Sequence, residues 1–294
     1  MEYKDEMLEV DLGNGQARVM LCETTQTVQK CADIHSCSPV CTAALGRLMT
    51  GTLMLGMMLK GEEESVTVSI RGGGPIGTLI AVSEPGRVRA CADHPQVDLP
   101  LRPDGKLDVG GAVGHDGMLT VVRALGHGKQ YVGQSALVNG EIAMDFAQYF
   151  TMSEQQNSLV SLGVLVSGDA VMKAGGLLIQ PLPGCEDGMI DQLELRSPMF
   201  ADISREMTFA EPEILIQDWF RGLSPQILKK TPLRYECTCS RERMAGALIS
   251  LGASDLQSLI DEGRGAELTC HFCHQKHFFS TGELRSMLIS GRKS

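Results

Sequence analysis

Two closely spaced pairs of cysteines constrain the fold of this chain more than any other feature. The first pair is Cys237 and Cys239, the second is Cys270 and Cys273, and 30 residues lie between the pairs. In an extended segment residues i and i+2 point to the same side, so both sulfurs of the first pair can face one ion. The second pair can do the same from a turn. Four thiolates at about 2.3 Å complete the tetrahedral shell of a structural zinc ion and leave no open position for catalysis. The spacing predicts one zinc ion per chain, bound by these four cysteines.

A role in core packing explains these cysteines less well than metal binding does. Four of the ten cysteines fall within a polar stretch of 37 residues, and packing alone does not account for that concentration. His271, His274 and His277 could each replace a cysteine as a ligand. Because four thiolates already complete the shell of zinc, we expect these histidines at the surface or around the ligands.

Two other cysteine chemistries fit part of the pattern. Residues 270–274 satisfy the C-x-x-C-H motif of c-type haem attachment, and close cysteine pairs also occur in thioredoxin-like redox sites. Haem attachment would leave Cys237 and Cys239 unexplained. A thioredoxin-like site requires a surrounding βαβ unit, and the sequence pattern around these cysteines does not predict one. Neither alternative accounts for all four residues.

The other six cysteines show no ligand spacing. Residues 1–6 are acidic and do not resemble a secretory leader, so we expect a cytoplasmic protein. Cytosolic cysteines seldom form a framework of structural disulfides. We therefore expect most of these six to be small buried hydrophobic residues. They are Cys22, Cys31, Cys37, Cys41, Cys91 and Cys185.

The segment Val40–Leu59 is apolar or small almost throughout and is long enough to cross a membrane. Ser38 and Pro39 before it are a typical N-cap and first helical residue, and Lys60-Gly61 is a plausible end. Arg47 in mid-span, three glycines five residues apart and the lack of a second span favour a helix buried inside the protein. A membrane span is the less favoured alternative.

Short strands are predicted after this helix. Val66, Val68 and Ile70 alternate with polar residues, the pattern of a half-buried strand. The glycines at 72–74 lack the spacing of a phosphate-binding loop, so we interpret them as a structural turn. Residues 1–180 are predicted to form one α+β domain around the buried helix. Its further elements are strands at Ile76–Val82, Val88–Cys91, Leu119–Ala124, Tyr131–Val138, Leu159–Val166 and Val171–Leu182, and a helix at Glu141–Phe150.

Two further parts follow this domain. Residues 181–232 contain short amphipathic pieces, which we interpret as a metastable helical linker because short helices depend on packing for stability. Residues 233–294 form a small zinc-binding domain. Each piece of the linker opens with a residue followed by proline: Ser197-Pro198, Glu211-Pro212, Ser224-Pro225 and Thr231-Pro232.

The tail carries two predicted capping boxes and a predicted hairpin. The boxes are Ser254 with Gln257 and Ser280 with Glu283, and the hairpin strands are Ala266–Thr269 and His277–Phe279.

The charge of the chain argues against general nucleic-acid binding. The formal net charge is −10, whereas contact with phosphates requires clustered lysine and arginine. Positive and negative side chains are nearly balanced in the C-terminal segment, so it does not present the basic face of a zinc-ribbon nucleic-acid module. No nucleophile–base or acid–base constellation is recognisable, and we do not expect an enzyme.

Five motifs give the chain a resemblance to a known family. They are Ala43-Ala44-Leu45-Gly46-Arg47, Gly72-Gly73-Gly74-Pro75-Ile76-Gly77, Ser153-Glu154-Gln155, Gly175-Gly176-Leu177-Leu178-Ile179-Gln180 with Pro183-Gly184, and the C-x-C and C-x-x-C pairs of the tail. With them the sequence closely resembles the redox-regulated 33 kDa heat-shock chaperone family, also called the 33 kDa chaperonin. The likeness covers nearly the whole chain, and the four cysteines are its defining signature.

This resemblance implies a holdase that binds unfolding proteins under oxidative stress without ATP. The reduced, zinc-bound form would be inactive, and the oxidised, partly unfolded form would be active and often dimeric. The resemblance also implies that oxidation pairs Cys237 with Cys239 and Cys270 with Cys273 and releases zinc. A zinc-ribbon nucleic-acid module and a thiol–disulfide oxidoreductase remain the alternatives.

Overall fold

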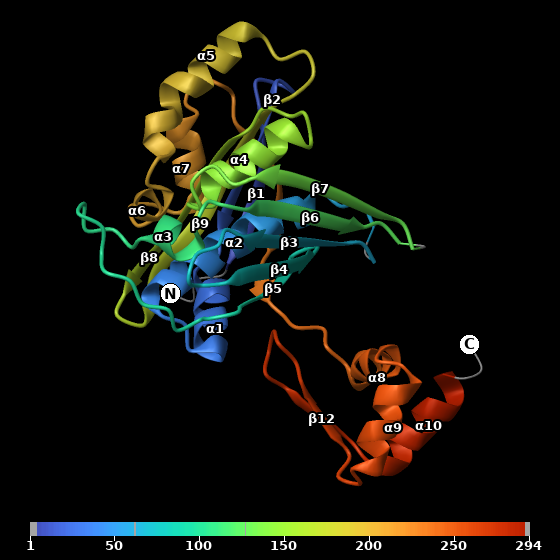
Figure 1. Cartoon of the computed structure of the whole chain (residues 1–294). Helices are drawn as coiled ribbons and strands as arrows, with labels where there is room; N and C mark the ends of the chain where they lie inside the picture. The colour runs from blue at the N-terminus through green and yellow to red at the C-terminus, as the bar shows by residue number, and fades with distance from the viewer. Residues whose placement is uncertain (1–4, 62, 127, 292–294) are drawn as a thin grey trace. The chain divides into compact units, whose positions relative to one another are not determined.

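The chain forms two compact units, residues 1–236 and 237–294. Their structure is a computed structural model that describes residues 5–61, 63–126 and 128–291, so the first four residues of the acidic segment 1–6 lie outside the described part (Figure 1). The first unit contains two sheets and a buried helix, and the second carries the cysteine pairs among three helices and a hairpin. The predicted α+β class is confirmed.

The predicted buried helix is α2, Pro39–Met57. The Ser38 side chain accepts a hydrogen bond from the Cys41 amide at 3.2 Å, as an N-cap does. Among the described residues it is the one helix long and apolar enough to cross a membrane, and 89% of its apolar window is buried inside the protein. Arg47 is compensated by an ion pair with Glu141 at 2.6 Å. The helix ends at Met57, before the predicted Lys60-Gly61 stop.

Helix α2 packs between two sheets, which explains why it is buried all round. It contacts β3, β4 and β5 of a six-stranded sheet on one side and β8 and β9 of a five-stranded sheet on the other. The first unit therefore has one large core around α2. A second helix, α1 (Thr25–His35), packs beside it. Helix α4 (Ala143–Met152) is the predicted helix Glu141–Phe150, shifted by two residues at each end.

The six-stranded sheet has the order β11-β5-β4-β3-β6-β7, with antiparallel neighbours except for the β11–β5 pair. Its glycine-rich connection after β3 is a structural turn, as predicted: a Cβ on Gly72 would lie 2.3 Å from the Gly114 carbonyl oxygen. The backbone of this turn lies against α3 (Val109–Val113) and the residue after it. The strands are β3 (Ser65–Arg71), β4 (Thr78–Glu84), β5 (Arg87–Ala92), β6 (Met118–Ala124), β7 (Gln130–Ala136) and β11 (Arg234–Tyr235).

The five-stranded sheet is antiparallel in the order β10-β1-β2-β9-β8. Its strands are β1 (Glu6–Leu12), β2 (Ala17–Glu23), β8 (Leu159–Ser167), β9 (Ala170–Pro181) and β10 (Gln226–Pro232). The prediction of linker helices at Ser224-Pro225 and Thr231-Pro232 was wrong. Ser224 has a φ of 51°, so it is not a helix N-cap, and residues 226–232 satisfy their backbone by pairing with the edge strand β1.

Four short helices cover one face of the five-stranded sheet, and we call residues 187–220 the covering helices (Figure 1). They are α5 (Asp187–Arg196), the 3-10 helix η1 (Ser197–Phe200), α6 (Ile203–Glu206) and α7 (Pro212–Trp219). Ser197-Pro198 and Glu211-Pro212 begin helices as predicted. The covered sheet face is largely apolar, and it forms a second core with the helices. The sheet contributes Leu8, Val10, Leu12, Ala17, Val19, Leu21, Leu177 and Ile179.

This second core places residues 181–232 inside the first unit. The sheet face and the covering helices are the two sides of the same cluster, so neither is buried without the other. The boundary between compact units lies after Glu236, close to the predicted start of the last domain at residue 233. That residues 181–232 open as a separate segment stays a prediction.

The second unit has a much smaller core. Its helices α8 (Arg241–Ser250), α9 (Ala253–Asp261) and α10 (Thr281–Gly291) pack together, and β12 (Ala266–Thr269) pairs with β13 (Lys276–Phe279) (Figure 1). The capping box at Ser280 is confirmed, because its amide donates to the Glu283 carboxylate at 2.8 Å. The predicted capping box at Ser254 was wrong, because α9 begins at Ala253 and Ser254 therefore lies inside its first turn. The core consists of Leu248, Leu256, Ile260, Ala266, Phe279 and Leu284.

Candidate metal centre

The first cysteine pair lies in the segment that enters α8. Ser240 is the N-cap of α8, and its hydroxyl accepts a hydrogen bond from the Arg243 amide at 3.2 Å. The Arg243 guanidinium reaches back and donates to the Thr238 carbonyl at 3.0 Å and to its hydroxyl at 2.8 Å. Thr238 stands between the two cysteines. The helix start therefore fixes the backbone on which Cys237 and Cys239 are carried.

The second pair lies in the turn of the β12–β13 hairpin. The Cys270 amide donates to the Gln275 carbonyl at 2.9 Å, and the His274 amide donates to the Cys270 carbonyl at 2.9 Å. His274 has a φ of 57°, a left-handed conformation that closes the turn. Because both ends of the turn are bonded to each other, Cys270 and Cys273 are held on one side of it, as the spacing predicts.

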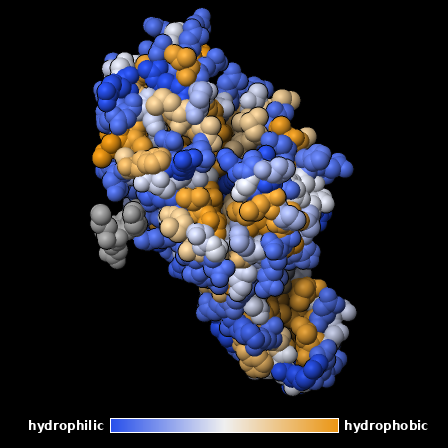
Figure 2. All heavy atoms as spheres, turned by 90° about the vertical axis from the view of Figure 1, so that its left-hand side faces the viewer, coloured by the Kyte–Doolittle hydropathy of each residue, from blue (hydrophilic) through white to orange (hydrophobic). Residues whose placement is uncertain are grey.

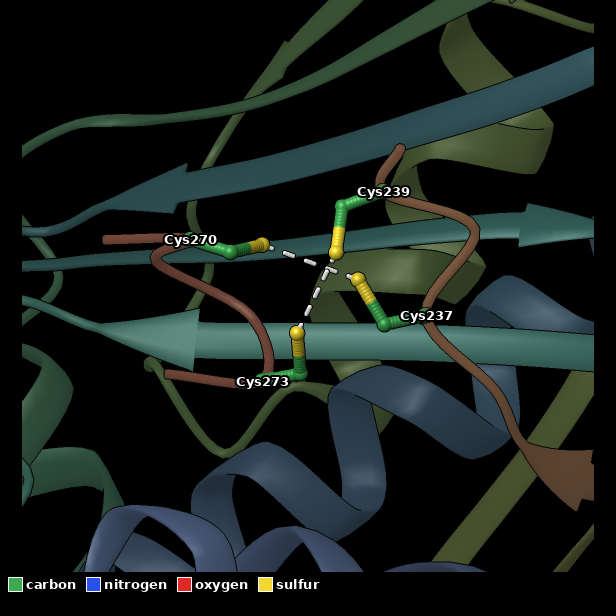
Figure 3. Close-up of side chains that lie close together, drawn as sticks. All are labelled: Cys237, Cys239, Cys270 and Cys273. Carbon is green, nitrogen blue, oxygen red and sulfur yellow. Dashed lines mark hydrogen bonds between the residues drawn. The ribbon is translucent and has the colours of Figure 1, made fainter. Parts of the chain in front are cut away.

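The four sulfur atoms gather around one point (Figure 3). All lie within 4.8 Å of one another; Cys237 and Cys270 are 3.6 Å apart, and Cys239 and Cys273 are 3.4 Å apart. Thiolates at about 2.3 Å from a tetrahedral zinc ion are separated by about 3.8 Å. These two distances lie within 0.4 Å of that value, so the four sulfurs fit a metal ion with a closed sulfur shell. Tetrahedral sulfur sites suit zinc or iron–sulfur chemistry.

The electrostatics of the cluster differ among its members. Burial, with smaller contributions from Cys273 and Cys270, raises the pKa of Cys237 to about 11. Burial and the contact with Cys273 also raise the pKa of Cys239 well above its usual range. Burial opposes ionisation of Cys270 too, but the amides of Phe272 and Cys273 and the neighbouring thiols outweigh it and lower the pKa of Cys270. Thiolates gathered this closely need a cation to balance their charge.

The three histidines of the tail do not join this cluster. Among the described residues, the group that can hold a metal consists of the four cysteines alone. His271 and His274 are exposed, whereas His277 is buried in the hairpin and its Nε2 atom has no hydrogen-bond partner. Sequence reasoning missed the positioning contact between Arg243 and Thr238, although the N-cap signal of Ser240 before α8 could have suggested it.

Three of the other six cysteines are buried as expected, namely Cys22, Cys31 and Cys41. The remaining three are partly exposed, so half of the six, and not most of them, are buried. The partly exposed residues are Cys37, Cys91 and Cys185.

Comparisons with known proteins give one consistent family. The family model described as "Hsp33 protein" matches residues 5–280. The 33 kDa chaperonin of Alkaliphilus metalliredigens is 41% identical over 94% of this chain and 95% of its own length. That of Listeria monocytogenes is 43% identical over 93% of this chain and 95% of its own. The crystal structure of the 33 kDa chaperonin from Thermotoga maritima has a TM-score of 0.89 at 32% identity, and the match covers 99% of this chain and 100% of that one.

Proposed function

This chain belongs to the Hsp33 protein family, and from that premise we propose that it is a redox-regulated, ATP-independent holdase. A chaperone of this family binds unfolded client proteins. The observation that carries the redox switch is the cluster of four sulfurs within 4.8 Å, in a unit whose hydrophobic core has six buried members among the described residues. A unit this small depends on a metal or another staple for its stability.

In the reduced form, Cys237, Cys239, Cys270 and Cys273 hold one zinc ion. The ion would supply charge balance for the thiolates and a cross-link between the entry to α8 and the hairpin turn. Because metal binding contributes folding free energy to a small domain, the metal-bound second unit is compact and the protein is inactive.

On oxidation the four sulfurs form two disulfides, Cys237–Cys239 and Cys270–Cys273. Two equivalents of peroxide accept the four electrons of the thiolates, take up four protons from the solvent and leave as four water molecules. The bonded sulfurs no longer offer thiolates, so zinc is released. The two shortest distances join the opposite partners, Cys237 to Cys270 and Cys239 to Cys273. All four sulfurs lie within reach of one another, so the pairing rests on the family resemblance and is testable.

The client-binding surface is the apolar sheet face under the covering helices. These helices are short, from four to ten residues, and helices of this length have little stability without packing. Lifting them away exposes both sides of the second core, a surface large and apolar enough to hold unfolded chains. Hydrophobic side chains also form exposed patches on the outside of the molecule (Figure 2).

The proposal also covers the oligomeric state, the binding partners and the cellular location of the protein. The oxidised protein is a homodimer, acts in the cytoplasm, and has no nucleic-acid partner and no enzymatic activity of its own. The zinc-ribbon and thiol–disulfide oxidoreductase alternatives are not favoured, because the relatives over nearly the whole chain are named chaperonins.

Light scattering from a thermally unfolding client enzyme tests the proposal, with zinc release followed by a chromogenic chelator. The reduced wild-type protein should hold one zinc ion and leave aggregation unchanged, and after peroxide it should lose the zinc and suppress aggregation. Cys185→Ser, which changes a partly exposed cysteine in the first unit, is the matched control and should behave as wild type. Zinc release without suppression, or continuous turnover of a dithiol substrate, would contradict a holdase.

A further inference from the structure

A cavity lies in the first unit where the covering helices meet the five-stranded sheet, and we call it the seam pocket. Its volume is about 640 Å³, a size typical of ligand pockets. One side is formed by residues of β2, β8 and β9, and the other by residues 207–214, which join α6 to α7. Helix α6 lies against β8 and β9 (Figure 1). The cavity is thus built from both the sheet and the covering helices.

The walls of the seam pocket are apolar and open to solvent. Four large hydrophobic residues that line it have exposed side chains, namely Leu165, Met172, Phe209 and Ile214. An exposed apolar patch around a cavity marks an interaction site. Met172 and the buried Met207 have flexible side chains, which adapt to apolar groups of different shape.

A buried ion pair borders these walls. The Lys173 ammonium is 2.6 Å from the Glu23 carboxylate, and both side chains line the pocket although they are buried. Ligand sites commonly combine apolar walls with a few fixed polar groups that orient the ligand. The seam pocket has both of these features.

One carboxylate of the pocket is available to a ligand. Glu211 lines the pocket, is exposed and forms no ion pair with another described residue. The lysines of this region are engaged elsewhere, Lys173 with Glu23 and Lys230 with Glu213. A cation that approaches from solvent can therefore pair with Glu211.

Neighbouring carboxylates increase the negative charge around Glu211. It lies close enough to interact electrostatically with Glu23 and with Glu6, and Glu23 interacts in the same way with Asp5. A bound cation relieves the repulsion among like charges. The pocket is therefore complementary to a ligand that carries a positive charge beside bulky apolar groups.

We propose that the seam pocket binds a peptide segment in which large apolar side chains stand next to lysine or arginine. The apolar side chains contact Met172 and Ile214, and the cation pairs with Glu211. A segment with glutamate beside the same apolar residues is repelled, because its charge has the sign of the pocket.

A bound segment contacts both sides of the seam and so holds the covering helices closed. Met207 packs directly on the sheet, since a Cβ on Gly175 of β9 would lie 2.5 Å from its Sδ atom. Lifting residues 207–214 away would remove one side of the pocket, and a ligand that binds the closed state alone stabilises it. The consequence for activity rests on the proposed function: an occupied pocket opposes exposure of the client-binding face.

Fluorescence anisotropy with the reduced, zinc-bound, full-length protein tests the site. The probe is a short fluorescein-labelled peptide of leucine and phenylalanine flanked by lysines, and the comparison peptide has glutamates in place of the lysines. The lysine peptide should bind, and more weakly as salt is raised. The glutamate peptide should bind about tenfold more weakly. Equal binding of the two peptides, or no binding of the lysine peptide, would refute the proposal.

Two substitutions and a matched control locate the binding. Met172→Lys removes an apolar contact and adds a positive charge to the pocket wall, so it should weaken binding of the lysine peptide roughly tenfold. Glu211→Gln should weaken it about two- to fivefold. Met144→Lys makes the same change on α4, outside the pocket, at a position that is 52% exposed compared with 56% for Met172, and should bind as wild type. Equal losses in the two methionine variants would assign binding to overall charge and overturn the site.

Hydrogen exchange tests the effect on the covering helices. With the lysine peptide at about a hundredfold excess over its Kd, residues 207–214 should exchange up to about a hundredfold more slowly. Met172→Lys at the same peptide concentration should show only about tenfold slowing. Bound peptide without slower exchange would mean that it contacts one side of the seam, which would overturn the closed-state effect. Neither readout depends on client aggregation, so this proposal and the proposed chaperone function fail separately.

Discussion

Replacing Phe220 with alanine tests whether the covering helices control access to the client-binding face. Phe220 is fully buried at the end of α7, with its ring centroid 5.5 Å from that of Phe200. Truncation of a buried phenylalanine costs about 3–5 kcal/mol. Because the lost contacts belong to the second core, the cost falls on the closed state of the covering helices. Every 1.4 kcal/mol is tenfold, so the open population should rise roughly a hundredfold to several thousandfold.

The single tryptophan provides the assay. Trp219 is 4% exposed, and its ring centroid lies 5.3 Å from that of Phe200. In reduced, zinc-bound Phe220→Ala, tryptophan emission should shift to longer wavelength, and residues 187–220 should lose protection from hydrogen exchange. The same protein should suppress client aggregation without peroxide.

Phe209→Ala is the matched control, because it removes the same side chain from the same segment at a position that is 70% exposed. Its closed state should keep wild-type stability to within about 0.5 kcal/mol. If Phe220→Ala exposes Trp219 but does not suppress aggregation, the covered sheet face is not the client-binding surface. If Trp219 stays buried, the covering helices are more stable than their length indicates.

Four further outcomes are expected. Cys270→Ser should weaken zinc binding and loosen the second unit without oxidant, since it removes one ligand of a closed site; unchanged metal affinity by chelator competition would exclude Cys270 as a ligand. Lys173→Met should destabilise the first unit by about 3–5 kcal/mol in chemical denaturation, because it leaves Glu23 buried without its 2.6 Å partner. Burial raises the pKa of Asp5, so its contribution to stability is present at low pH and lost as pH rises through that pKa. The unfolding free energy of Asp5→Asn relative to wild type should accordingly increase from pH 4 to pH 7, and a constant difference would contradict this. Zinc release by peroxide should survive replacement of all six cysteines of the first unit, and its loss in a folded variant would assign the switch to Cys22, Cys31, Cys37, Cys41, Cys91 or Cys185.

The sequence predicted those parts of the fold whose signals are local. Ser38 and Pro39 begin α2 because a hydroxyl and a fixed φ suit a helix start wherever it occurs. The alternation of residues 66–70 sets the buried face of β3 in the same way. The orientation of the sulfurs within each cysteine pair of the tail is also a local property, since an extended segment or a turn is enough to point both sulfurs to one side.

Long-range pairing was beyond such reasoning. The prediction omitted β1 and β2, and residues 226–232 were expected to be helical because Ser224-Pro225 resembles a helix start. Their conformation is set by β1, more than 200 residues earlier in the chain.

The two units differ in the size of their hydrophobic cores. The first unit has a large core around α2 and a second core beneath the covering helices, whereas the hydrophobic cluster described in the second unit has six buried residues. In the proposed mechanism, loss of zinc therefore unfolds the second unit first.

The chain connection between the two units determines which part of the first unit is affected when the second unit unfolds. Cys237 directly follows Glu236, whose amide donates to the Val88 carbonyl at 3.0 Å, and β11 before it is only two residues long. Its anchor is Tyr235, a buried residue whose hydroxyl donates to the Ala90 carbonyl at 3.2 Å. The other end of β11 continues into the edge strand β10, which follows the covering helices in the chain. Edge strands and short helices open at lower free-energy cost than the helix between the sheets. Release of the second unit should thus propagate through β11 and β10 toward the covering helices, while α2 and the strands in contact with it, β3, β4, β5, β8 and β9, stay closed.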